Sequence, residues 1–203
     1  MPQIVLVDDH PVVRLGLRAL LAEEPDLAIV GEAARIEDAV RAVDLRRPDL
    51  VVLDVRLEGR PAGPDLCRTL KGLPVRPAVL VLTARAAAEE VTAMYLAGAD
   101  SFVDQTMAPD ELVATVRATL DGRRVWVPHP RPPVGRGGAG ADRLREHLTP
   151  REREVLGLLL QRRTNAEIAR ALHLGLPTVK THVSAVLRKL GLTRRLDLFV
   201  DVA

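Results

Sequence analysis

Short apolar runs alternate with amphipathic segments through the first part of the chain. The runs that predict strands are residues 3–7, 28–30, 50–53, 79–82 and 101–103. The segments with apolar residues at helical spacing are residues 11–21, 36–46, 86–97 and 109–120. Strands that are apolar on both faces and alternate with helices are typical of a parallel sheet covered on both sides. We therefore expect an α/β domain, doubly wound around a five-stranded parallel sheet.

The end of the chain shows helical spacing alone. Residues 176–191 place one apolar stripe on a helix, with Pro177 in its first turn. Two shorter helices precede it, and each opens with a Thr-x-x-Glu capping box, at Thr149 and at Thr164. Residues 193–202 predict a short fourth helix. Helix, tight turn and helix is the plan of the helix-turn-helix, whose second helix enters the major groove of DNA. We expect a small all-α, four-helix domain of this kind.

The polar face of the helix at residues 176–191 contains no acidic side chain. It carries Lys180, Thr181, Ser184 and Arg188. A solvated surface helix usually mixes both signs of charge, so this face favours contact with phosphate groups. Two alternatives stay open on the residues alone: an ordinary solvated face, and a helical hairpin that packs only its own core. The hairpin would explain the apolar stripes but not the acid-free face.

The net charge of +2 hides an asymmetry between the two halves. Residues 1–122 contain 13 Lys and Arg against 20 Asp and Glu, whereas residues 123–203 contain 16 against 7. An acidic part joined to a basic part is expected when only one of them binds nucleic acid. Residues 127–141 are rich in proline and then in glycine, as in a linker. We expect the α/β domain at 1–122, the linker at 123–145 and the helix-turn-helix domain at 146–203.

Several kinds of site and location are excluded by the sequence. Cys67 is the only cysteine, so an internal disulfide and a cysteine-based zinc site are impossible. No apolar run reaches the length of a membrane span, and Asp8 and Asp9 come too early for a signal peptide. We therefore expect a cytoplasmic protein with no membrane partner.

Three carboxylates and a hydroxyl follow strands at one edge of the predicted sheet. Asp8 and Asp9 follow the first strand, Asp54 the third and Thr83 the fourth. In such sheets, ligands gather outside the carboxyl ends of the strands. Converging carboxylates repel each other unless a cation neutralises them, and oxygen ligands suit Mg²⁺. Each aspartate alone could simply cap the following helix, but the set together favours a magnesium site.

The C-terminal motifs resemble the LuxR-type helix-turn-helix along its whole length. The matching segments, between Thr149 and Gly191, are TPRE, EVL, Asn165, EIA, TVK, HV and KLG. Two residues depart from the family pattern: Arg162 stands where a glycine is common, and Gly175 stands where a serine usually caps the recognition helix. The resemblance implies that the partner of this domain is double-stranded DNA.

The first half resembles the receiver domain of two-component response regulators. The matching residues are Asp8-Asp9-His10-Pro11, Asp54, Thr83-Ala84, and Gly98-Ala99 followed by Phe102. The resemblance implies that Asp54 accepts a phosphoryl group from a histidine kinase. It also implies that Mg²⁺ is held by Asp8, Asp9, Asp54 and the carbonyl of Arg56. Thr83 would turn toward the phosphoryl group and Phe102 would follow it. A receiver followed by a LuxR-type helix-turn-helix is the plan of the NarL/FixJ subfamily.

The receiver half departs from its family at the site itself. Gln105 stands where the family has a lysine, Asp104 precedes it, and Glu58 replaces a common proline in a loop one residue longer. These departures leave open an atypical receiver that works without phosphorylation, under a ligand or a partner protein. A third alternative is an aspartyl-phosphate hydrolase, whose general acid would stand at Arg56. Because arginine cannot donate a proton at neutral pH, we expect no enzyme.

The acid-free face and the resemblance together assign contacts to the recognition helix. We expect Lys180, Thr181 and Ser184 at base edges. We expect Thr178, His182, Arg188 and Lys189 nearer to phosphates. In the family the last helix pairs two DNA-binding domains, so we expect an active homodimer. Its operator should be palindromic, with half-sites about one helical turn, ~34 Å, apart.

Overall fold

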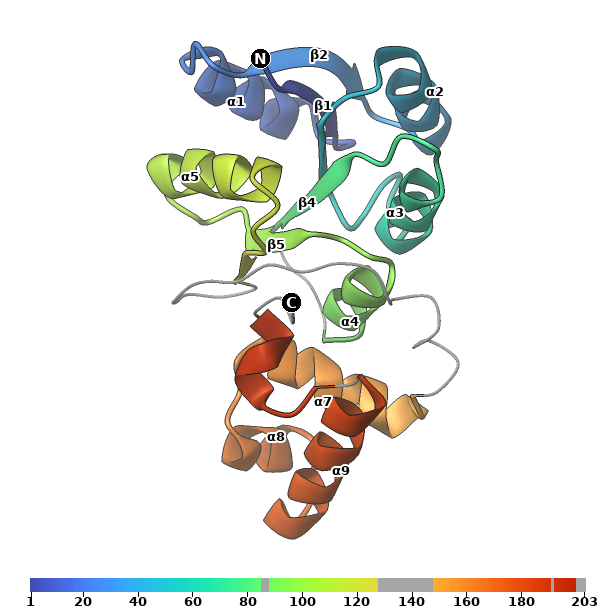
Figure 1. Cartoon of the computed structure of the whole chain (residues 1–203), viewed down its shortest axis with the longest axis vertical. Helices are drawn as coiled ribbons and strands as arrows, with labels where there is room; N and C mark the ends of the chain where they lie inside the picture. Colours follow the sequence, from blue (N-terminus) through green and yellow to red (C-terminus); the bar gives the residue numbers. More distant parts are fainter. Residues whose placement is uncertain (85–87, 128–147, 191, 200–203) are drawn as a thin grey trace.

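A parallel sheet of six strands forms the first part of the computed structural model, which describes residues 1–84, 88–127, 148–190 and 192–199 (Figure 1). The order of its strands is β2-β1-β3-β4-β5-β6. Their bounds are β1 (Gln3–Val7), β2 (Ala28–Ala33), β3 (Leu50–Leu53), β4 (Ala78–Thr83), β5 (Ser101–Asp104) and β6 (Trp126–Val127). Helices α1 (Pro11–Ala22) and α5 (Pro109–Leu120) cover one face. Helices α2 (Ile36–Arg46), α3 (Gly63–Lys71) and α4 (Ala88–Leu96) cover the other. The predicted doubly wound sheet is confirmed.

Alternation along the strands explains why both faces are covered. Ile4 and Leu6 of β1 belong to the hydrophobic cluster beneath α1 and α5. Val5 and Val7 belong to the cluster on the side of α2, α3 and α4. Successive residues of a strand point to opposite faces, so the apolar run at residues 4–7 is stable only when both faces are buried.

Helix α3 was not predicted from the sequence. Its nine residues are too few for a clear periodic pattern, although Leu66, Cys67 and Leu70 all face the core. The helix begins tightly against the end of β3, because a Cβ atom at Gly63 would lie 2.8 Å from both the Cα and the carbonyl oxygen of Val55. Only glycine fits at such a distance, so Gly63 fixes where the chain turns back.

Strand β6 lies in the segment that was assigned to the linker. It pairs in parallel with β5, and the amide N–H of Phe102 donates to the carbonyl of Val125 over 2.7 Å. Trp126 stacks on Phe102 with 5.4 Å between ring centroids, and Tyr95 of α4 meets Trp126 edge-on at 5.2 Å. The receiver fold therefore extends through Val127. The rest of the predicted linker, residues 128–145, lies outside the described residues.

The C-terminal domain contains α7 (Pro150–Leu160), α8 (Asn165–Ala171), α9 (Leu176–Lys189) and the 3-10 helix η1 (Arg195–Phe199). Both predicted capping boxes are present, at the starts of α7 and α8. The last helix was predicted at residues 193–202 and is instead a short 3-10 helix over part of that range. Asp197 accepts the backbone N–H of Arg194 over 2.7 Å, which favours a tight turn at this point. Residues 200–203 lie outside the described part of the chain.

The two domains contact each other through α4 and α7 (Figure 1). The hydroxyl of Thr92 donates to the carbonyl of Arg153 over 3.0 Å. One cluster of buried side chains includes Val91 and Met94 of α4 as well as Val155 of α7. Helix α9 extends from there toward the end of the molecule opposite the sheet. Across the described ranges, we find no helix with both the length and the apolar character that a membrane span requires.

Arg162 has a left-handed backbone conformation, at a position where its family commonly has glycine. Its φ is 59°, and a side chain in this region costs about 1–2 kcal/mol. We expect Arg162→Gly to stabilise the C-terminal domain by about 1 kcal/mol and to raise its Tm by several degrees in thermal unfolding of the full chain. Arg163→Gly is the matched control, because Arg163 does not have a positive φ. A lower Tm for Arg162→Gly would show that the backbone of Arg162 is not strained.

Candidate metal centre and nucleic-acid interface

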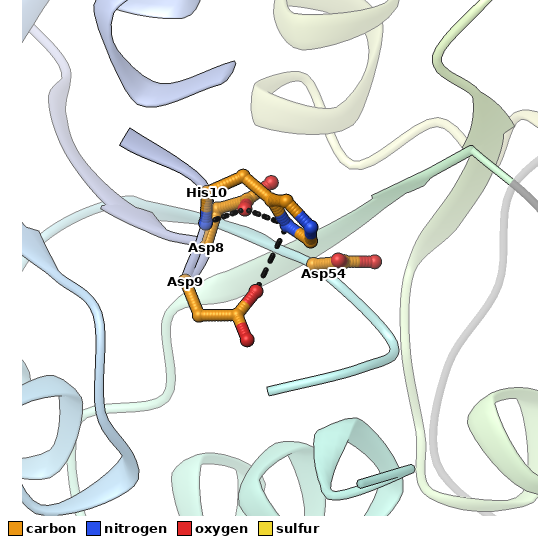
Figure 2. A group of neighbouring side chains, drawn as sticks. All are labelled: Asp8, Asp9, His10 and Asp54. Atoms are coloured by element: carbon orange, nitrogen blue, oxygen red, sulfur yellow. Dashed lines mark hydrogen bonds and ion pairs between the residues drawn. The ribbon is translucent and has the colours of Figure 1, made fainter. Parts of the chain in front are cut away.

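The acidic residues predicted for the metal site meet at the point where the strand order reverses. Strand β1 lies between β2 and β3, and ligands in such sheets bind at this switch point. Asp8 and Asp9 follow β1, and Asp54 follows β3. Figure 2 shows these side chains converging with that of His10. One potential ligand atom from each of the four residues lies within 4.8 Å of all the others.

His10 joins this cluster although its ring was not assigned a role from the sequence. Its Nδ1 atom lies 3.1 Å from Oδ1 of Asp8 and 2.9 Å from Oδ1 of Asp9 (Figure 2). The hydrogen bond to Asp8, followed by the charge of Asp9, raises the pKa of His10. The only sequence signal for this contact was its position directly after two aspartates. Protonated His10 therefore partly neutralises the pair.

Asp54 is buried, and its environment suits a cation. Burial raises the pKa of Asp54, while a hydrogen bond with Thr83 and backbone hydrogen bonds from Arg56 and Val55 oppose the rise. Among the described residues, none donates a hydrogen bond to the Oδ1 atom of Asp54. A buried carboxylate oxygen without a donor is costly. A divalent cation among the three aspartates would remove that cost, so these residues fit Mg²⁺.

The lengthened loop after Asp54 closes on Asp9 through a tight hairpin. Leu57 and Arg60 exchange backbone hydrogen bonds of 2.9 and 3.0 Å. Glu58 and Gly59 between them have φ values of 53° and 73°, as in a type I′ turn. The N–H of Glu58 donates to Oδ2 of Asp9 over 2.7 Å. The proline common at this position in the family has no N–H and cannot adopt this φ, so Glu58 adds a support for Asp9.

Arg56 connects the same loop to α4. Its Nη1 atom donates to Oε1 of Glu90 over 3.0 Å, and its Nη2 atom donates to the carbonyl of Gly59 over 3.1 Å. The side chain thus bridges the acid pocket and the helix that contacts α7. The predicted role of the Arg56 carbonyl as a metal ligand stays a prediction.

The residues expected to relay a signal lie beside one another on β4 and β5. Thr83 pairs with Asp104 in the sheet, and the N–H of Gln105 donates to the carbonyl of Thr83 over 3.0 Å. Phe102 is buried and stacked on Trp126. The carboxylate of Asp104 accepts the N–H of Thr106 at 2.7 Å and its hydroxyl at 2.6 Å. Asp104 therefore stabilises the turn after β5.

Helix α9 presents the predicted DNA face to solvent. Thr178, Lys180, Thr181, Ser184 and Arg188 are exposed and His182 is half-buried. Val179, Val183, Val186 and Leu187 form the opposite, buried stripe. A hollow of about 440 Å³ on the exposed side is lined by Lys180, Thr181, Ser184, Ala185 and Arg188. Ala185 was not among the predicted contacts. This exposed face carries Lys180 and Arg188 and no acidic residue, and the major groove admits an α-helix.

Lys189 has a different surrounding from the other predicted contacts. Its ammonium lies 2.6 Å from Oε2 of Glu152. That oxygen also accepts the N–H of Thr149, which caps α7. Burial alone would raise the pKa of Glu152, but the bonds from Lys189 and Thr149 outweigh it and lower that pKa. Lys189 thus ties α9 to the start of α7, a structural contact that was not expected from the sequence. Its predicted phosphate contact stays a prediction.

Loss of this ion pair should lower the stability of the domain rather than weaken DNA contacts. Lys189→Ala leaves the buried Glu152 carboxylate without its cation, at a cost of about 2–3 kcal/mol. We expect a clearly lower Tm at pH 7. Because the folded-state pKa of Glu152 is lowered, the difference from wild type should shrink as the pH falls through that pKa. Arg188→Ala, on the exposed face, should leave the Tm unchanged. A Lys189→Ala protein with wild-type stability and a reduced salt slope of DNA binding would restore the phosphate role.

Comparison with known proteins agrees with both halves of the chain. A family model described as the response regulator receiver domain matches residues 4–117, and one described as bacterial regulatory proteins, luxR family, matches residues 146–202. The transcriptional activator DevR/DosR of Mycobacterium tuberculosis is 39% identical over 96% of this chain and 91% of its own. The response regulator VraR of Staphylococcus aureus is 34% identical over 95% of this chain and 92% of its own.

Solved structures show the same two-domain fold. The response regulator ChrA of a heme-sensing two-component system is 31% identical, with a TM-score of 0.53 over 97% of this chain and 94% of its own. RcsB in a complex with DNA, at 22% identity and a TM-score of 0.56 over 98% of this chain and 96% of its own, shares the fold alone. The chain therefore belongs to the response regulators that join a receiver domain to a LuxR-type helix-turn-helix, and it is a DNA-binding transcriptional regulator.

Proposed function

We propose that Asp54 is the phosphoryl acceptor of this regulator and that the DNA-binding output depends on its phosphorylation only weakly. The first part rests on the buried Asp54 carboxylate between Asp8 and Asp9. The second rests on Gln105, which stands where the family has a lysine. A neutral amide can donate a hydrogen bond to a phosphoryl oxygen, but a charge-assisted bond from lysine would be roughly twice as strong.

Mg²⁺ is the cation that we propose for this pocket. Asp8, Asp9 and Asp54 would hold it, together with the carbonyl of Arg56. When bound, it would supply the positive charge that balances the carboxylates and the phosphoryl oxygens. Asp54 must be ionised to attack a phosphodonor, and burial opposes its ionisation. Phosphorylation should therefore be slow and strictly dependent on the metal.

A receiver that works without phosphorylation is the alternative, and one observation favours it. Thr83 already forms a hydrogen bond with Asp54, and Phe102 is already buried beneath Trp126. The side chains of the two residues that would move on phosphorylation thus already point inward in the unmodified protein. A ligand or partner protein would then set the output through α4.

The operator side of the proposal follows from α9. Lys180, Thr181 and Ser184 read base edges, and Thr178, His182 and Arg188 lie near phosphates. Two domains paired through the region of η1 would read a palindrome with half-sites ~34 Å apart. A histidine kinase would be the second macromolecular partner. Because operator DNA lies in the cytoplasm, we place the protein there.

The deciding measurement is operator affinity of wild type and Asp54→Asn, each with and without a small phosphodonor and Mg²⁺. We expect appreciable binding by both proteins without phosphodonor, and less than a tenfold gain for phosphorylated wild type. A phosphate-affinity gel measures the phosphorylated fraction, and sedimentation measures dimerisation in the same samples. A gain of tenfold or more confined to phosphorylated wild type would overturn the weak dependence and restore an ordinary phospho-switch.

Catalytic turnover is not part of the proposed function. A phosphatase on this kind of sheet would need a proton donor two residues after Asp54, and Arg56 occupies that position. Release of product from a generic phosphomonoester at a rate above that of Asp54→Asn would revive the enzyme alternative.

A further inference from the structure

The hollow on α9 is lined by two neighbouring rows of side chains from this one helix. One row, four residues apart, is polar or charged and consists of Lys180, Ser184 and Arg188; in the next row, Ala185 supplies a methyl group. Ala185 is half-buried. Its side chain can neither donate nor accept a hydrogen bond. In a surface otherwise suited to phosphates and base edges, this position can recognise only another apolar group.

Thr181 adds a second methyl group to the row of Ala185 in the same hollow. Its hydroxyl donates to the carbonyl of Pro177, one helical turn earlier, over 3.1 Å. A threonine hydroxyl has one proton, so Thr181 cannot also donate to a base while this bond is present. Its γ-methyl group and its oxygen lone pairs are what remain to meet a ligand. The predicted position of Thr181 at a base edge therefore implies contact through its methyl group or its oxygen lone pairs.

The spacing of the two methyl groups suits a single methyl between them. Residues four apart on a helix have Cβ atoms about 5–6 Å apart. A methyl carbon placed over such a pair can contact both at about 4 Å. The major groove offers one such group, the 5-methyl of thymine, and alanine and threonine methyls are suited to contact it. The hollow lies on the exposed side of α9, so the base edge that carries this methyl group can reach it.

We propose that Thr181 and Ala185 form a thymine-methyl site on the recognition helix, so that each operator half-site contains a thymine at a fixed position. This inference rests on the proposed orientation of α9 in the major groove. Ala185 acts as a specificity residue that excludes bases without an apolar group at this point. Lys180 and Arg188 bind acceptors on either side.

The test replaces single thymines by deoxyuridine, which removes the methyl group and keeps the base pair. The operator is first selected from random DNA with the full wild-type chain, and each thymine of the selected half-site is then replaced in turn. We expect one position at which the replacement lowers affinity about fourfold, as for the loss of one buried methyl-sized group. The remaining thymines serve as internal controls.

Variants of the protein separate a methyl contact from a hydroxyl contact. Thr181→Ser keeps the hydroxyl that bonds Pro177 and removes only the methyl, whereas Ala185→Gly removes the other methyl. In both variants the penalty for deoxyuridine at the sensitive position should fall toward onefold. Thr178→Ser, at an exposed threonine outside the hollow, should retain the full penalty. Equal Tm values confirm that each variant is folded.

The possible outcomes distinguish a failure of the proposed operator binding from a failure of the thymine site alone. If no DNA is selected, the proposed operator binding fails, and the thymine site fails with it. If an operator is selected but no deoxyuridine position lowers affinity, only the thymine site is wrong. A penalty that persists in both Thr181→Ser and Ala185→Gly would show that other residues contact the methyl group, and this too would overturn the assignment.

Discussion

Replacing Lys180 by alanine should weaken operator binding by about ten- to a hundredfold and relax specificity at one base position. A good base contact is worth about 1–3 kcal/mol, which corresponds to this range. Lys180 is exposed at the wall of the hollow on α9. Its loss should reduce affinity much more for the selected operator than for random DNA. The measurement is affinity for both DNAs over a series of salt concentrations.

Arg188→Ala is the matched control, because Arg188 lines the same hollow near its other end. As a phosphate contact it should weaken binding to all sequences alike and reduce the salt slope by about one unit. Wild-type affinity of Lys180→Ala at every salt concentration would show that α9 is not the recognition helix. Equal losses of affinity for operator and random DNA would show that Lys180 contacts phosphates and not base edges.

Introducing the missing lysine should accelerate phosphorylation of Asp54. The Gln105→Lys variant places a cation on the residue whose backbone N–H already donates to the carbonyl of Thr83. A charge-assisted bond to the phosphoryl group exceeds a neutral one by about 1 kcal/mol or more, so the rate should rise about tenfold. The measurement is the phosphorylated fraction against time, with a small phosphodonor and a titration of Mg²⁺.

The chain carries its own reporter for this experiment. Trp126 is the only tryptophan, and it stacks on Phe102. If phosphorylation of the variant moves Phe102, Trp126 fluorescence should change with the same time course. The double variant Asp54→Asn with Gln105→Lys should show neither change. An unchanged rate in Gln105→Lys would assign the obstacle to the hairpin at Glu58 or to the turn held by Asp104.

The sequence predicted those features that follow from strong local patterns. Apolar strand segments that alternate with helices predicted a parallel sheet. Carboxylates directly after β1 and β3 were therefore expected to lie together at one edge of that sheet. Both capping boxes were legible because each needs only a threonine and a glutamate three residues apart. The stripe Val179, Val183, Val186 and Leu187 fixed which side of α9 faces solvent.

Features that depend on contacts between distant segments could not be predicted in the same way. Lys189 is 37 residues from Glu152, and nothing in its local sequence distinguishes it from Arg188. Strand β6 has two residues and is stabilised by Phe102 and Tyr95, which precede it by more than 20 residues. Packing, rather than pattern, decides each of these.

The contact between α4 and α7 makes the two domains partners in an intramolecular complex. The 20 residues between Val127 and Leu148 can span at most about 70 Å. Each domain therefore meets the other at an effective concentration on the order of 1 mM. A contact with a dissociation constant of tens of micromolar would stay closed in the intact chain and yet separate once the linker is cut. A change of about 1.4 kcal/mol in the free energy of the contact between α4 and α7 would then alter the fraction of molecules with separated domains about tenfold.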